Sequence, residues 1–177
     1  MAVTISGSTP TFSAGYAGGV ITSGAAQAST SGTSIDFTSI PSWVKRITVM
    51  LNQISTNGAS APQIQVGSGS IATSGYLSAA VGAVVGNIAS GNVFSSGFVL
   101  NGASTAAANT HQGRLTLNLL SGNVWTAQGS LSVTGGTVSM YVVDGTVTLG
   151  GTLDRVRITT VNGTDTFDAG SINILYE

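Results

Sequence analysis

The residues that could do chemistry in this chain are few and far apart. There is one histidine, His111, and there is no cysteine. Disulfides, thiolate nucleophiles and thiolate metal sites are therefore excluded. A zinc site needs about three or four His, Cys or carboxylate ligands, so one histidine argues against a histidine-based site. Because His111 stands among small polar residues, we expect it to be a solvated loop side chain.

Aspartates are the other group that could support catalysis. Asp165 and Asp168 stand close together in the sequence. Glycosidases need two carboxyl groups about 5–10 Å apart, and calcium needs about six to eight oxygen ligands. Two aspartates meet neither need alone, although Asp36 and Asp154 could join them in space. We favour a structural interpretation, in which aspartates bond to loop amides or pair with nearby arginines. The expected structural set is Asp154, Arg155, Arg157, Asp165 and Asp168.

Aromatic side chains suggest binding rather than catalysis. Sugar rings stack on exposed aromatic rings that amides and hydroxyls flank. Tyr16 and Tyr76 stand beside glycine and serine, so we expect both to be exposed and name them as candidate glycan-binding residues. Trp43 and Trp125 are expected to fill the core or a subunit interface, because large aromatics dominate both. No phosphate-binding loop is present, and no cofactor is expected.

The charge content excludes several classes of partner. Only 6% of the residues are charged, and the formal net charge is −1, whereas a soluble domain has about 25% charged residues. Lys45 and four arginines cannot form the basic stripe that nucleic acid requires. Attraction to an anionic membrane surface is excluded for the same reason. The polar residues are mostly neutral, so copies repel one another weakly. This favours a protein that forms part of an oligomer or a large assembly. The alternative is a neutral soluble domain.

The mean hydropathy of +0.37 raises the question of a membrane segment. The most apolar window, 77–89, is shorter than the roughly 20 residues of a spanning helix and contains Ser78 and Asn87. No membrane insertion is expected. The first residues lack a basic and an apolar stretch, so we expect no secretory signal.

The chain divides into two regions of different texture. Residues 1–33 are small and flexible, and we expect an extended N-terminal arm or attachment segment. Residues 34–177 show period-two alternation, as in Ile47, Val49 and Leu51, which is typical of strands. Strands are expected over 34–38, 44–55, 63–66, 93–100, 114–119, 124–133, 138–143, 155–159 and 172–176.

Turn signals separate these strands. They are Asn57-Gly58, Gly122-Asn123, Gly135-Gly136, Asp144-Gly145 and Asn162-Gly163. No window has a convincing helical stripe with a cap. Short strands with frequent turns predict a sandwich, jelly roll or barrel. We expect an all-β fold, an antiparallel β-sandwich of jelly-roll type.

Two parts of the sequence resemble a known family. The first comprises 40–50 (IPSWVKRITVM) and 54–58 (ISTNG), and the second comprises 155–160 (RVRITT) and 163–173 (GTDTFDAGSIN), with TSGY at 73–76 between them. They are similar to a β-sandwich domain at the C-terminal ends of tailed-bacteriophage tail-fibre and related virion proteins. The resemblance covers about residues 30–177.

The resemblance implies a viral structural protein on the exterior of the virion. It implies a homotrimer that projects outward and contacts host cell-surface polysaccharide, with other virion proteins bound through residues 1–33. Such a protein assembles in the host cytoplasm and is released by lysis. The resemblance transfers no binding residue to this chain.

Three functions follow as hypotheses. The first is a short tail fibre or receptor-binding tip, because the sequence has no long shaft. The second is a capsid decoration (cement) protein that stabilises the head and grips the shell with its arm. The third, an enzyme such as a polysaccharide depolymerase, requires Asp36, Asp154, Asp165 and Asp168 to meet in a cleft. We expect no enzyme.

Overall fold

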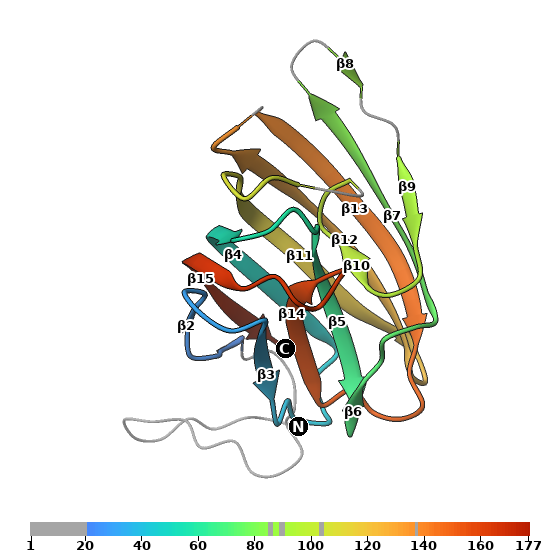
Figure 1. The fold of residues 1–177 in the computed structure, drawn as a ribbon. Coiled ribbons are helices and arrows are strands. Elements are labelled where there is room, and N and C mark those ends of the chain that lie inside the picture. The colour runs from blue at the N-terminus through green and yellow to red at the C-terminus, as the bar shows by residue number, and fades with distance from the viewer. Residues whose placement is uncertain (1–20, 85–86, 89–90, 103–104, 137) are drawn as a thin grey trace, which may run out of the picture.

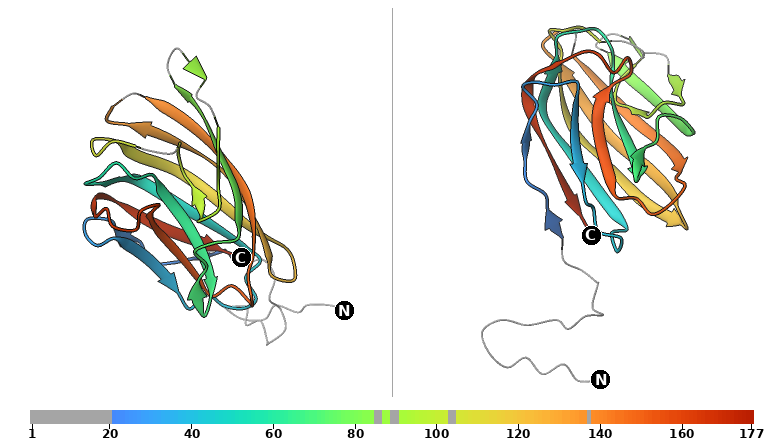
Figure 2. Two further views of the ribbon diagram at one scale, coloured as in Figure 1. Left: turned by 45° about the vertical axis from the view of Figure 1, so that its right-hand side comes forward. Right: turned by 60° about the horizontal axis from the view of Figure 1, so that its bottom comes forward.

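The structure is a computed structural model that describes residues 21–84, 87–88, 91–102, 105–136 and 138–177. Within these ranges every regular element is a β-strand, and none is a helix. The strands form two antiparallel sheets that pack against each other, as Figures 1 and 2 show from three sides. The predicted all-β sandwich is therefore confirmed.

The larger sheet has ten strands and the smaller has five. The large sheet contains β1 (Thr22–Ser23), β2 (Gln27–Ala28), β4 (Arg46–Thr56), β7 (Tyr76–Val84), β8 (Asn87–Ile88), β9 (Asn92–Phe94), β11 (Thr110–Ser121), β12 (Val124–Thr134), β13 (Ser139–Thr148) and β15 (Phe167–Tyr176). The small sheet contains β3 (Ser34–Thr38), β5 (Pro62–Ser68), β6 (Ser70–Ile71), β10 (Phe98–Val99) and β14 (Arg155–Thr160).

The order of strands in space sets what each sheet presents. The large sheet runs β1-β15-β4-β11-β12-β13-β7-β8, with β2 added to β15 and β9 added to β7. The small sheet runs β10-β5-β14-β3, with β6 added to β5. Strands β11, β12 and β13 follow one another in both sequence and space, whereas β13 and β7 meet only through the tertiary fold.

The core lies between the sheets and follows from strand alternation. In β4, Ile47, Val49 and Leu51 are at most 5% exposed, while the residues between them point the other way. They face Val156 and Ile158 of the small sheet within one hydrophobic cluster. Each such side chain contributes about 1.5–3 kcal/mol when it is fully buried.

Two Gly-containing turn signals had different outcomes. Gly122 has a φ of 55° in the turn between β11 and β12, a conformation that glycine adopts without strain. The expected hairpin turn at Asp144-Gly145 is wrong, because both residues lie inside β13. A Cβ on Gly145 would lie 2.6 Å from the Leu77 carbonyl oxygen. Glycine is needed there for the close approach of β7 and not for a turn.

The described part of the expected arm lies along the sandwich. Thr22 and Ser23 pair with β15, and so do Gln27 and Ala28; Figure 2 shows these segments beside that strand. The Ser29 hydroxyl donates to the Ala169 carbonyl at 2.8 Å. Residues 21–33 thus extend the large sheet, while residues 1–20 lie outside the described part of the chain.

Candidate interaction surface

We call the face of the large sheet that points away from the small sheet the outer face. One row of paired residues crosses it. Met50 on β4 lies opposite Arg114 on β11, Arg114 lies opposite Ser130 on β12, and Ser130 lies opposite Val142 on β13. Val142 in turn lies opposite Val81 on β7. From Arg114 to Val81 the row passes from polar to apolar side chains, so the outer face has two halves.

The polar half lies over β4, β11 and β12. An open groove of about 700 Å³ runs across it. The groove is lined by Arg46, Thr48, Met50, Gly113, Arg114, Thr116, Ser130 and Leu175. A smaller neighbouring depression adds Asn118, Gln128 and Gly129 and reaches Val142 of β13. Hydroxyls, amides and guanidinium groups therefore line this half together with Met50 and Leu175.

The apolar half lies over β13, β7 and β9. Its side chains are large and exposed: Leu77 by 72%, Val81 by 47%, Val93 by 79%, Met140 by 59% and Val142 by 54%. They are neighbours in the sheet. Val142 lies opposite Val81, and Val93 lies opposite Ala79 on the same strand as Val81. A contiguous apolar patch on a soluble protein usually marks an interaction site.

The outer face also carries two charges without a partner. Arg46 forms an ion pair with Glu177. Arg114 and Asp144 form no ion pair or hydrogen bond through their side chains among the described residues. They lie two strands apart, because Arg114 is opposite Ser130 and Asp144 is opposite Gln128, two residues away on β12.

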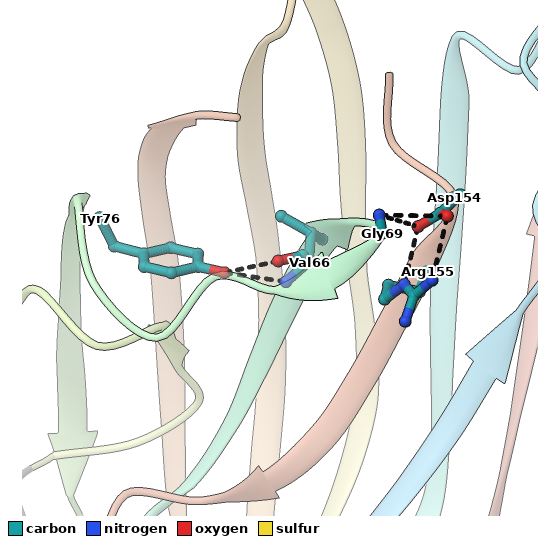
Figure 3. Close-up of polar contacts among 5 residues, drawn as sticks. All are labelled: Val66, Gly69, Tyr76, Asp154 and Arg155. Atoms are coloured by element: carbon teal, nitrogen blue, oxygen red, sulfur yellow. Dashed lines mark hydrogen bonds and ion pairs between the residues drawn. The ribbon is translucent and has the colours of Figure 1, made fainter. Parts of the chain in front are cut away.

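The small sheet uses its charges differently. Arg157 donates two hydrogen bonds to Asp36, at 2.7 and 2.8 Å. Arg155 donates two to Asp154, at 2.7 and 3.1 Å, and the Gly69 amide also donates to Asp154 (Figure 3). The bonds from Arg155 lower the pKa of the Asp154 carboxyl. The expected structural pairing of Asp154, Arg155 and Arg157 is therefore present within the fold.

Of the other two aspartates, Asp165 follows the loop-bonding interpretation, whereas Asp168 bonds to a strand hydroxyl. Asp165 accepts hydrogen bonds from the Ser60 amide at 2.9 Å and from the Asn162 side chain at 2.6 Å. Asp168 accepts one from the Ser55 hydroxyl. The aspartates thus have separate partners, and the described ranges contain no group of three or more His, Asp or Glu that could hold a metal ion.

The expectation that Tyr76 is exposed is wrong. Its side chain is 1% exposed, and its ring packs edge-on against Phe98 at 5.0 Å. Its hydroxyl accepts from the Val66 amide at 2.8 Å and donates to the Ala72 carbonyl at 3.0 Å; Figure 3 shows the contact with Val66. Burial raises its pKa to about 12. Tyr76 connects β7 of the large sheet to β5 of the small sheet and cannot stack on a sugar.

The expectation for His111 is also wrong. His111 lies in β11 and is 1% exposed. Its Nε2 atom lies 3.2 Å from the Asn101 amide nitrogen and 3.4 Å from the Thr105 hydroxyl. Burial lowers its pKa, so the ring is neutral at pH 7. No ion pair joins it to a carboxylate within the described residues.

The remaining aromatic candidates separate clearly. Trp125 is 2% exposed and belongs to the core, as expected. Trp43 is 40% exposed, and its ring lies 5.9 Å from that of Tyr176. Tyr16 lies outside the described residues. Trp43 stands in the connection between β3 and β4 and not in the core.

Comparison with known proteins adds no relative to this geometry. No family model matches the chain, and no curated protein or solved structure matches it. Among the described residues, none belongs to a helix long and apolar enough to cross a membrane.

Proposed function

We propose that this chain is a structural protein of a bacteriophage particle, acting as a short tail fibre or receptor-binding tip on the virion exterior. The observation that carries the proposal is the outer face of the large sheet. It exposes an apolar half on a neutral β-sandwich, as expected of a module that works in an assembly. The resemblance of the two segments described above to phage virion proteins is the reason that we identify this assembly as a phage particle.

The proposal assigns the protein a binding role and not a catalytic one. His111 is buried, Asp165 is engaged by the Ser60 amide, and Asp168 is engaged by the Ser55 hydroxyl of β4. Asp36 and Asp154 are engaged by neighbouring arginines. If the protein is non-catalytic, host polysaccharide incubated with it should keep its length distribution on gel filtration. A shortened polysaccharide would show a depolymerase instead.

Within this proposal, we place the glycan contact at Trp43. Its indole is an exposed aromatic surface 5.9 Å from the Tyr176 ring, and its sequence neighbours Ser42 and Lys45 are exposed and polar. An aromatic ring with one apolar face and polar neighbours suits the stacking of a sugar ring.

The deciding experiment locates the chain on intact particles of the phage that encodes it. Gold-labelled antibody should mark the tail end, and Trp43→Ala should reduce adsorption to host cells. Val161→Ala changes an exposed residue that directly follows β14 and should leave adsorption unchanged. Label on the head would favour the capsid cement alternative. Unlabelled particles would contradict a virion role.

A further inference from the structure

We propose that the outer face binds the outer face of a second copy of this chain, with Arg114 of each copy opposite Asp144 of the other. This contact goes beyond the proposed function, since it holds for the purified protein whether or not the chain belongs to a phage. It would use the apolar half and the central part of the polar half together.

The apolar half supplies the first argument. Leu77, Val81, Val93, Met140 and Val142 are exposed by between 47% and 79%. They lie on three neighbouring strands, so their exposed surfaces form a patch and not isolated points. The free energy of hydrating such a patch favours its burial against another surface.

The charges on the same face identify the partner. Arg114 is the one arginine in the described ranges without a carboxylate partner. Asp144 is an exposed aspartate that has no cationic partner in the same ranges. Both lie on the outer face, and uncharged Ser130 and Gln128 lie between them. A face that carries one unpaired cation and one unpaired anion is complementary to itself, so a second copy satisfies both.

A two-fold axis makes this complementarity complete. Such an axis through the midpoint between Arg114 and Asp144 exchanges the two positions, so a single contact forms both ion pairs. Apolar surface next to them is buried by the same operation. A contact on this face leaves the small sheet free, and with it any separate three-fold contact of the kind the resemblance implies.

The test exchanges the two charges. We would measure the self-association constant of the full chain by sedimentation equilibrium. Arg114→Asp and Asp144→Arg each place like charges opposite each other, so each should weaken association about tenfold or more. The double variant R114D/D144R restores opposite charges and should associate within about threefold of wild type.

Mixing the two single variants tests the symmetry. In an equimolar mixture, one variant has two acidic positions and the other has two arginines, so a two-fold contact joins them into a heterodimer. Lys45→Asp serves as the charge-matched control, since this exposed cation precedes β4, and it should not alter association. Circular dichroism checks that each variant keeps its β structure.

Several outcomes would overturn the proposal. They are a wild-type chain that stays monomeric at about 100 μM, single variants that associate as wild type does, and a double variant no better than the singles. A mixture that fails to associate while the double variant succeeds would overturn the two-fold arrangement. Restoration in both the double variant and the mixture supports the contact as stated.

Discussion

The outward faces of the two sheets use charge in opposite ways. On the small sheet, Arg155 and Arg157 are each held by two hydrogen bonds to an aspartate of the same chain. On the large sheet, Arg114 and Asp144 have no partner among the described residues, and they share the outer face with exposed apolar side chains. The arginines of the small sheet are thus paired within the chain, whereas Arg114 and Asp144 of the large sheet are available to a binding partner. This difference indicates that a protein partner binds the outer face of the large sheet and not the small sheet.

The largest effect should come from a charge placed in the apolar half. Val142→Asp puts a carboxylate at a position that the proposed contact buries, without a partner and near Asp144. Self-association should weaken by about hundredfold or more, which corresponds to about 3 kcal/mol. Sedimentation equilibrium measures it.

The control for this variant lies on the small sheet. Thr38→Asp adds the same charge to an exposed strand position opposite Arg155. Association of this variant should stay within about twofold of wild type. If both substitutions weaken association equally, the two faces do not differ in the way proposed.

The next prediction concerns the hydrogen bonds through which Tyr76 joins the two sheets. Tyr76→Phe removes the hydroxyl that bonds Val66 and Ala72 and leaves buried backbone groups without that partner. The free energy of unfolding should fall by about 1–3 kcal/mol in urea denaturation. Tyr141→Phe is the matched control, because no hydrogen bond to that hydroxyl occurs in the described ranges, and it should change stability by less than about 0.5 kcal/mol.

A pH titration should report the same residue. Burial raises the pKa of Tyr76 from 10.0 to about 12, so the folded state keeps a proton that the unfolded state releases. The stabilisation is therefore complete below pH 10 and is lost as the pH rises toward about 12. At pH 11 the loss in the free energy of unfolding is about 1 kcal/mol. Stability curves of wild type and Tyr76→Phe should converge over this interval; parallel curves would contradict the assignment.

The smallest effect compares one carboxylate from each face in the monomer. Asp36→Asn removes the partner of Arg157, which is partly exposed, so the free energy of unfolding should fall by up to about 1 kcal/mol, less at high salt. Asp144→Asn breaks no contact and should stay within about 0.5 kcal/mol. Equal losses in dilute, monomeric protein would remove the contrast between the faces.

Most of the strands were predictable from their own alternation, although the expected strand 93–100 is divided between β9 and β10 in different sheets and β7 was not predicted. The expected strand 44–55 corresponds to β4, Arg46–Thr56, and the expected strand 155–159 corresponds to β14, Arg155–Thr160. Asp154 and its arginine neighbour also paired as their positions suggested. In these cases the local sequence carries the needed information, since side chains alternate between core and solvent along one strand.

The failures arose where a distant strand decides the environment. Ser74 and Gly75 indicate a turn, but pairing of β7 with β13 directs the next residue, Tyr76, into the core. Gly145 resembles a hairpin turn, but it permits close approach of β7. The apolar half of the outer face was invisible for the same reason, because β7 and β13 lie far apart in sequence.

The position of β15 has a consequence for how the protein is made. This strand pairs with β4 on one side and with β1 and β2 on the other. β4 ends at Thr56, whereas β15 begins at Phe167, so during synthesis one edge of β4 waits for a partner until nearly all other strands have left the ribosome. An open strand edge can pair with a neighbouring nascent chain. This edge of β4 must therefore stay unpaired through translation, and the completed outer face forms only when synthesis has passed β15.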